Sequence, residues 1–360
     1  MLSSTFNSRL NVALTFNVKP ESETFNQDLP PIQDKSASEL QVSSDTFAEW
    51  DTWETINALK EAIACFHDVT LVEADQNAYE KFKDLKPDIV FNIAEGLNGV
   101  NRESQIPAML DMLSIPYTGS DALTLGICLD KARTKEILSY HKIPNAKFML
   151  ADKLDVIPTN NFTFPVIVKP LSEGSSKGIF SSSLVKNHNE LKDEAIKIIS
   201  QYNQPALIEE FLPGREFTVA IIGNDDSAKV LPIIEINYEK FPEGVVSLYS
   251  YEAKWILDTK ESNFDVFECP AKIDFNLAEE IRNTALKAYN VLNCKDWSRV
   301  DLRLDKNNVP NIIEINPLPG IMPDPTENSS FPKAARAAGI DYNQMILSVL
   351  FAAAKRYHLA

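Results

Sequence analysis

The sequence predicts an α/β protein that begins with a parallel sheet flanked by helices. In the first third of the chain, short apolar runs alternate with segments whose apolar residues recur at helical spacing. Such alternation is typical of parallel strands joined by helices. Later in the chain, two apolar runs joined by polar residues 305–308 predict a β-hairpin at 299–316. A further strand ends at Lys169 and runs into a loop rich in Ser and Gly.

The N-terminal elements follow from apolar periodicity and from helix-capping residues. Residues 19–51 are polar, acidic and proline-containing, which predicts a mobile surface insertion. A helix should begin near Asp51, because Asp51 and Glu54 have the spacing of a capping box. The loop that carries Glu95 should lie at the ligand-binding edge of the sheet. The other expected elements are strands at 10–16, 69–72 and 88–93 and a helix at 77–85.

The rest of the chain mixes longer helices with further strands. The segment 188–202, for example, has an apolar stripe at helical spacing. Expected helices lie at 121–141, 188–202, 277–292, 331–338 and 342–357, and expected strands at 164–169, 179–181, 206–212, 215–222 and 229–237.

Composition excludes several classes of function. A chain of 360 residues with 44% hydrophobic and 24% charged residues is long enough for two or three globular domains. The formal net charge of −16 argues against nucleic acid or an anionic membrane as the main partner. The four cysteines are scattered, as is typical of reduced thiols, and no apolar run is long enough to span a membrane. We therefore expect a cytoplasmic protein.

The hairpin at 299–316 combines residues that suit a metal and phosphate site. Side chains alternate along a strand, so Arg299 and Asp301 share one face, and Glu314 and Asn316 share one face of the partner strand. Two carboxylates and an amide oxygen are hard ligands of the kind that Mg²⁺ accepts. An ordinary solvated hairpin would show the same alternation, so the hairpin alone does not decide.

Two other segments have features of a nucleotide site. In the loop after Lys169, glycines and the hydroxyls of Ser175 and Ser176 can cradle phosphate oxygens, although a flexible turn has the same composition. The segment 209–212 can be an ordinary sheet edge or a hinge whose backbone binds an adenine, with Glu216 on the ribose. Spacing alone leaves these alternatives open.

Taken together, these segments resemble the ATP-grasp superfamily and, within it, the D-alanine–D-alanine ligase family. The resemblance covers most of the chain, from roughly residue 89 to 350. It implies an ATP-grasp fold with an N-terminal parallel α/β domain (1–120) and two α+β subdomains, one central (121–209) and one C-terminal (210–360), with ATP between these two. The stretches that carry it are 115–120, 129–131, 168–170, 173–176, 207–210, 216–220, 251–254, 299–301 and 314–320.

The resemblance implies a role for each matching residue. Lys131 and Lys169 match the lysines on the α- and β-phosphates, and Lys254 matches the lysine at the γ-phosphate. Arg299 matches the arginine that steadies the acyl phosphate, and Ser175 lies in the loop that closes over the triphosphate. The remaining matches are Ser176 in the same loop, Glu209, Glu210 and Leu212 at the adenine, Glu216 at the ribose, and Asp301, Glu314 and Asn316 as ligands of two Mg²⁺ ions, for which Mn²⁺ can substitute.

This sequence departs from the family pattern mainly at positions that bind the substrates in that family. Glu95 stands where the family has a histidine, and Trp255 stands where a tyrosine follows the γ-phosphate lysine. The family's Ser-Leu pair for the second substrate's carboxylate, after the turn at Gly320, falls on Pro325 and Thr326. The family's glutamate for the first ammonium is missing after the first strand, and Glu54 is a candidate replacement.

The predicted function is an ATP-dependent carboxylate–amine ligase that acts through an acyl phosphate and releases ADP and phosphate. Its expected substrates are an amino acid and a second amino acid or carboxylate, all small molecules. Three alternatives stay open: a genuine D-alanine–D-alanine ligase, an ATP-grasp kinase, and a nucleotide-binding regulator without catalysis. The resemblance also suggests a homodimer.

Overall fold

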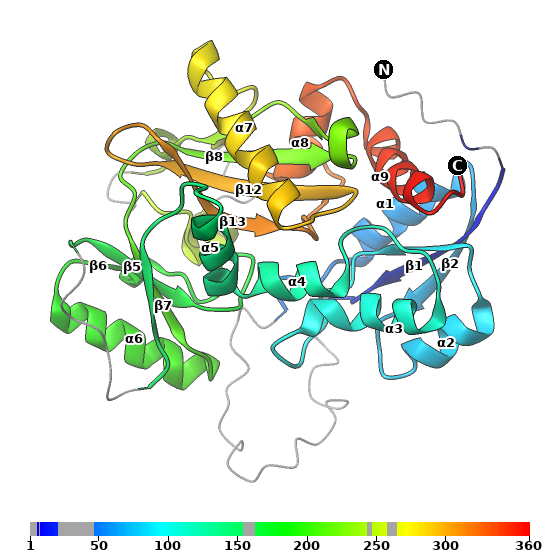
Figure 1. Cartoon of the computed structure of the whole chain (residues 1–360), viewed down its shortest axis with the longest axis horizontal. Helices are drawn as coiled ribbons and strands as arrows, with labels where there is room; N and C mark the ends of the chain where they lie inside the picture. Colours follow the sequence, from blue (N-terminus) through cyan, green and yellow to red (C-terminus); the bar gives the residue numbers. More distant parts are fainter. Residues whose placement is uncertain (1–5, 7, 21–46, 154–162, 243–246, 258–264) are drawn as a thin grey trace, which may run out of the picture.

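The computed structural model describes residues 6, 8–20, 47–153, 163–242, 247–257 and 265–360, and the side chains of Trp255 and Ile256 are also outside this description. The described strands form three sheets (Figure 1). Most of the predicted insertion, residues 21–46, lies outside the described residues.

The N-terminal sheet is parallel, as the alternation of strands and helices predicted. Its order is β2-β1-β3, and every residue of β1 after Asn11 is buried. A central strand covered on both faces explains the unbroken apolar run. The elements are β1 (Asn11–Phe16), α1 (Trp53–Ala64), β2 (Asp68–Glu73), α2 (Ala78–Leu85), β3 (Ile89–Asn92), a 3₁₀ turn (Arg102–Ser104) and α3 (Gln105–Leu113).

The predicted capping box at the start of α1 is wrong. Thr52 is the N-cap, and its hydroxyl accepts from the backbone N–H of Thr55 at 3.5 Å. Asp51 instead forms an isolated parallel bridge with Val18. Glu54 is exposed on the first turn of the helix.

The helix predicted at 121–141 is two helices that meet at Asp130. These are α4 (Ala122–Leu129) and α5 (Lys131–Tyr140). The backbone of Asp130 is extended, and its carboxylate accepts from the N–H groups of Ala132 and Arg133. A side-chain cap of this kind begins a new helix, so Lys131 becomes the first residue of α5.

A four-stranded antiparallel sheet follows, in the order β4-β7-β5-β6. Helix α6 covers it, with the bounds that were predicted (Figure 1). The strand predicted at 179–181 is wrong: Ser183 accepts from the N–H of Phe180 and closes a 3₁₀ turn there. The elements are β4 (Phe148–Ala151), β5 (Val166–Pro170), the turn (Ser181–Ser183), β6 (Leu184–Val185), α6 (His188–Tyr202) and β7 (Ala206–Glu210).

The third sheet has the order β11-β10-β8-β12-β13, with β9 also paired to β8. The strand predicted at 229–237 is interrupted around Pro232, which has no N–H for a ladder. The elements are β8 (Glu216–Ile222), a 3₁₀ turn (Asp225–Ser227), β9 (Lys229–Val230), β10 (Ile234–Ile236), a 3₁₀ turn (Tyr238–Lys240), a π-helical turn (Ala253–Leu257), β11 (Phe267–Glu268), α7 (Phe275–Val291), β12 (Trp297–Leu304), β13 (Pro310–Asn316), α8 (Ser330–Ala337) and α9 (Tyr342–Arg356).

A buried ion pair ties the N-terminal sheet to the third one. The carboxylate of Asp296, which is fully buried, accepts from the N–H of Gly119 and from Arg356 of α9 at 2.8 and 2.7 Å. One hydrophobic core also runs from α1 and β1 into α9 and β8. The N-terminal sheet is thereby held against the third sheet.

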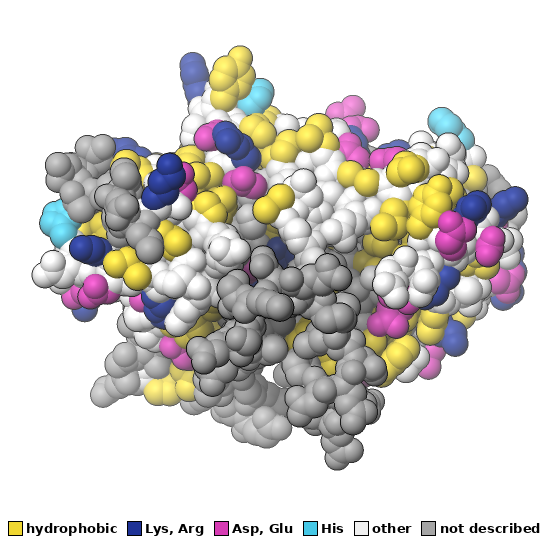
Figure 2. Space-filling model, turned by 90° about the horizontal axis from the view of Figure 1, so that it is seen from below, with side chains coloured by type: hydrophobic (Ala, Val, Ile, Leu, Met, Phe, Trp, Pro, Cys, Tyr) yellow, Lys and Arg dark blue, Asp and Glu magenta, His cyan; other side chains and the backbone are white. Residues whose placement is uncertain are grey.

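The exterior is mixed in charge. On the face shown in Figure 2, acidic and basic side chains are interspersed over both ends of the molecule. Of the helices in the described ranges, none combines the length and the apolar character needed to cross a bilayer.

Candidate active site

The β12–β13 hairpin brings its charged residues to one face, as predicted. Arg299 lies opposite Asn316 and Asp301 lies opposite Glu314. The guanidinium of Arg299 is 2.8 Å from Asp301 and 3.3 Å from Glu314. Burial by itself would lower the pKa of Arg299, but these two carboxylates hold it above its ordinary value. The hairpin is therefore an organised ionic surface with its guanidinium charged.

Arg303 follows on the same face of β12, because the extra residue of the β-bulge, Ile313, lies in β13 and β12 keeps a regular register with β8. Arg303 donates to Glu216 at 2.9 Å, and the hydroxyl of Tyr238 donates to the same carboxylate at 2.8 Å. Glu216 is buried. Groups from two other segments, β12 and the turn at 238–240, hold it in position.

One cavity between the second and third sheets collects most of the predicted site residues. Its apolar lining includes Ala146, Ile167, Phe211, Leu248 and Ile313, and its polar lining is mostly charged. The predicted residues that line it are Lys169, Ser175, Ser176, Glu209, Glu210, Leu212, Glu216, Lys254, Arg299, Asp301, Glu314 and Gly320.

Glu209 is the centre of a buried ionic triad. Its two carboxylate oxygens lie 2.6 Å from Lys135 and 2.6 Å from Lys169. Burial alone would raise the pKa of Glu209, but the two ammonium groups lower it to about 2. The triad joins α5, β5 and β7, so the charge that Lys169 presents to the cavity depends on residues from three elements.

The loop after Lys169 is hydrogen-bonded to Tyr249 and Lys254, which also line the cavity. The hydroxyl of Ser176 donates to the carbonyl of Tyr249 at 2.8 Å, and Lys254 is 3.4 Å from the hydroxyl of Ser175. Both serines have positive φ angles, of 50° and 60°. A cationic side chain and two hydroxyls are thus turned toward one space, which suits a phosphate chain.

Two predicted residues lie beside this lining. Lys131 donates to the carbonyl of Glu173 and is 3.6 Å from the carboxylate of Glu314. The amide oxygen of Asn316 accepts from the N–H of Leu318 at 2.9 Å, which fixes its orientation next to Glu314.

Comparisons with known proteins agree with this geometry. Residues 136–351 match the family model described as "D-ala D-ala ligase C-terminus". A D-alanine–D-alanine ligase of Vesicomyosocius okutanii subsp. Calyptogena okutanii is 36% identical over 73% of this chain and 81% of its own length. The chain belongs to the D-alanine–D-alanine ligase family. An uncharacterised protein, y4sG of Sinorhizobium fredii, is 34% identical over 81% of this chain and 85% of its own length.

Solved structures show the same fold. The crystal structure of a D-alanine–D-alanine ligase from Bacillus anthracis complexed with ATP has a TM-score of 0.69 and 22% identity, and the match covers 97% of this chain and 99% of that one. The predicted ATP-grasp fold is confirmed. As a member of this family, the protein is an ATP-dependent ligase that forms a C–N bond, as the sequence predicted.

Two of the residues that the sequence predicted to bind substrate, Glu54 and Pro325, are exposed. Glu54 is exposed, whereas Glu49 lies in a group of carboxylates with Glu95 and Glu103. Pro325 is exposed as well, and Ser329 and Ser330 line the cavity instead. The backbone of Trp255 lies in the π-helical turn after Lys254, but its side chain is outside the described residues.

Sequence reasoning missed four groups of residues, and some signals were available. Lys135 lies four residues after Lys131 in the same predicted helix. A second lysine at this spacing is typical of a solvated helix surface, so it was given no role. Glu49 was assigned to the insertion because polar, acidic sequence surrounds it. Ser329 and Ser330 directly precede an apolar helical stripe, which is a signal for a helix N-terminus. Arg102 and Glu103 drew no separate assignment, since only folding places them near Glu49.

Proposed function

We propose that this ligase activates the carboxylate of one amino acid by phosphorylation and joins it to the amine of a second small substrate. The observation that carries the proposal is the single cavity in which Lys169, Lys254 and Arg299 face Asp301 and Glu314. The division into an N-terminal domain (1–120) and two subdomains (121–209 and 210–360), with the nucleotide between the last two, belongs to the same proposal.

ATP binding is assigned to the apolar and cationic parts of the cavity. The apolar lining near Glu210 and Leu212 suits an adenine, and Glu216, held by Arg303 and Tyr238, suits the ribose hydroxyls. Lys169 and Lys131 would take the inner phosphates. Charge complementarity of this kind favours bound phosphates over water.

The hairpin carboxylates fit a metal site. Asp301 and Glu314 are cross-strand neighbours; Arg299 lies 2.8 and 3.3 Å from them, and Lys131 lies 3.6 Å from Glu314. With Asn316 they offer hard oxygen donors, which suit two Mg²⁺ or Mn²⁺ ions. Bound there, the ions would neutralise charge on the phosphates.

The chemistry follows from where charge develops. A carboxylate oxygen of the first substrate bonds to the γ-phosphorus of ATP, and the bond from phosphorus to the β,γ-bridging oxygen breaks to release ADP. The amine nitrogen of the second substrate then bonds to the acyl carbon, phosphate leaves with the electron pair of the C–O bond, and the amine loses a proton. Both steps build negative charge, so the fixed cations Lys254 and Arg299 stabilise the transition states. The loop of Ser175 and Ser176 excludes water.

The N-terminus of α8 is assigned to the carboxylate of the second substrate. Ser329 donates to the carbonyl of Gly320 and accepts from the N–H of Met322, so this turn is fixed. The next residue, Ser330, begins α8 and lines the cavity. Free N–H groups at a helix N-terminus favour an anion.

The test is incubation with ATP, Mg²⁺ and a panel of D- and L-amino acids, measuring phosphate release and product mass. Amine-dependent phosphate release with a condensed product supports the proposal. Release with D-alanine alone and D-alanyl-D-alanine as product would establish the genuine D-alanine–D-alanine ligase, and a phosphorylated hydroxyl product would establish a kinase. ATP binding without turnover would indicate a regulator.

Ser330→Ala is expected to raise the KM for the second substrate about tenfold, with the KM for ATP unchanged, because one hydrogen bond to a charged group is lost. Steady-state kinetics with each substrate varied in turn measures both constants. The control is Ser200→Ala on the exposed face of α6. A change confined to the KM for ATP would contradict the assignment.

A further inference from the structure

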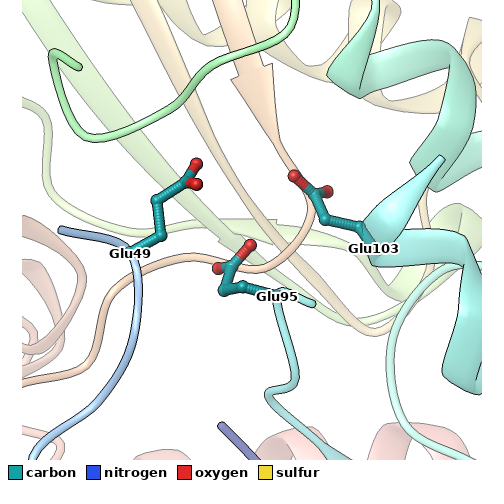
Figure 3. A group of neighbouring side chains, drawn as sticks. All are labelled: Glu49, Glu95 and Glu103. Atoms are coloured by element: carbon teal, nitrogen blue, oxygen red, sulfur yellow. The ribbon is translucent and has the colours of Figure 1, made fainter. Parts of the chain in front are cut away.

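The N-terminal part of the ligase contributes an acidic pocket next to the reaction centre. Glu49, Glu95 and Glu103 each offer a carboxylate oxygen, and these oxygens lie within 4.8 Å of one another. The residues come from the segment before α1, the loop after β3 and the 3₁₀ turn before α3. Figure 3 shows the three side chains converging on one space from three directions.

Among the described residues, Glu49 is the one carboxylate of the three that is hydrogen-bonded to a basic side chain. Glu49 accepts from Arg102 through both oxygens, at 3.0 and 2.8 Å. Arg102 is also 3.6 Å from Glu173, but Glu173 has its own cation, Lys177, at 3.0 Å. Arg102 and Lys177 are therefore engaged by Glu49 and Glu173.

Glu95 and Glu103 have no such partner. Over the ranges that the structure describes, neither carboxylate has a hydrogen bond or a salt bridge, although Glu103 is only 7% exposed and points into the pocket. Burial raises the pKa of Glu103 to about 8 and that of Glu95 well above its ordinary value. Buried carboxylates are normally paired, and an uncompensated pair of this kind is costly.

The pocket adjoins the catalytic cavity directly. The N–H of Gly174 donates to Glu49 at 2.8 Å, and a Cβ at Gly174 would overlap the same carboxylate oxygen. The next residue, Ser175, lines the cavity and lies beside Lys254. A ligand in the pocket would thus be within one substrate length of the residues assigned to the γ-phosphate.

We propose that Glu49, Glu95 and Glu103 bind the cationic end of a substrate, and that this substrate is a diamino acid, with one positive charge more than an ordinary amino acid. A primary ammonium has three N–H donors, one for each carboxylate. A nitrogen at the centre of a triangle with edges of 4.8 Å lies about 2.8 Å from each corner, which is a hydrogen-bond distance. The assignment rests on the proposed ligase function and specifies its substrate class.

The charge of the acidic pocket favours a diamino acid over an amino acid with an uncharged side chain. With Arg102 and Lys177 opposite Glu49 and Glu173, Glu95 and Glu103 are left without a basic partner among the described residues, and a bound ammonium would favour the charged form of each. An amino acid with an uncharged side chain brings one ammonium, and a diamino acid brings two. Mg²⁺ would need oxygens about 2.1 Å away, which requires the carboxylates to approach one another closely, while Arg102 already occupies both oxygens of Glu49.

The test compares the binding of ornithine and norvaline, which differ by one terminal amino group. Both enantiomers are titrated calorimetrically into the ligase in the presence of Mg²⁺ and ADP. Ornithine is expected to bind at least about tenfold more tightly, since each charge-assisted hydrogen bond contributes about that factor. Equal affinities, or tighter binding of norvaline, would overturn the proposal. If phosphate release with other amino acids is then still observed, the ligase function stands by itself.

A matched pair of variants locates the effect. Glu103→Gln keeps the size of the side chain and removes one charge, and it is expected to reduce the preference for ornithine over norvaline about tenfold while ADP affinity is unchanged. Glu61→Gln, on the exposed side of α1, makes the same change elsewhere in the N-terminal part and should leave the preference intact. A loss of ADP affinity equal to the loss of ornithine affinity would show a structural role only. Loss of a Mn²⁺ site in Glu103→Gln, counted by electron paramagnetic resonance, with ornithine binding unchanged would overturn the proposal in favour of a metal site.

Discussion

Glu314→Gln is expected to lower ATP turnover by roughly a thousandfold or more, without unfolding the protein. The carboxylate lies opposite Asp301 in the ladder and is 3.3 Å from Arg299 and 3.6 Å from Lys131. Burial alone would raise the pKa of Glu314, but the surrounding cations lower it, so the group is ionised at neutral pH. The amide keeps the shape and removes the charge that suits a divalent cation.

The measurement is phosphate release at saturating ATP, with circular dichroism to confirm the fold. Asp301→Asn should have an effect of similar size, since both oxygens belong to the same proposed metal site. Glu239→Gln, at an exposed position of the same subdomain, is the control for the chemical change. Wild-type turnover in Glu314→Gln would show that the face of the hairpin is structural.

Glu209→Gln is expected to destabilise the protein by about 3–5 kcal/mol, because removing one partner of a buried ion pair leaves an uncompensated charge. Here two ammonium groups, those of Lys135 and Lys169, lose their common partner, and both are almost completely buried. Denaturant unfolding followed by fluorescence measures the change. Glu280→Gln, exposed on α7, should change the free energy of unfolding by less than about 0.5 kcal/mol.

The double variant Lys135→Met/Glu209→Gln is expected to recover part of the lost stability, since one of the two unpaired ammonium groups is then gone. Additive losses in the two single variants would contradict the coupling between these residues. Nucleotide affinity should fall in Glu209→Gln as well, because the position of Lys169 depends on this carboxylate.

The same triad predicts a pH dependence of stability. The pKa of Glu209 is about 2 in the folded protein and 4.5 in the reference state, so its contribution is present above about pH 4.5 and is lost as the pH falls toward 2. The free energy of unfolding of the wild type should therefore fall more steeply in that window than that of Glu209→Gln. Parallel curves would indicate that Glu209 does not change its protonation on unfolding.

The helices and strands that sequence patterns predicted correctly are those with long, regular periodicity. Helix α6 has the bounds that its apolar stripe indicated, and β1 follows its apolar run. Errors occurred where one polar side chain changes the local backbone. Asp130 divides the helix predicted at 121–141, and Ser183 closes a turn where a strand was expected. Such hydrogen bonds depend on a particular side-chain rotamer, which periodicity does not report.

The candidate site shows the same difference between features set by local sequence and features set by tertiary contacts. Residues in short motifs, such as Asp301 with Glu314 or Lys169 with its serine loop, could be matched to the family pattern because the order and spacing of these motifs are visible in the sequence, although the hairpin and the loop alone left their roles open. Residues that come together through folding could not. Glu49 is 125 residues away from Gly174 along the chain, and yet its carboxylate accepts from the Gly174 N–H.

The sequence by itself determined the family, the α/β architecture and the reaction, because these depend on an ordered set of local motifs. Only the tertiary structure decided which residues lie around the cavity and the acidic pocket. It placed Glu49 rather than Glu54 beside Glu95, and Ser330 rather than Pro325 at the cavity. The physical reason is that substrate pockets form where separate elements meet, so their charge depends on packing between segments far apart in the chain.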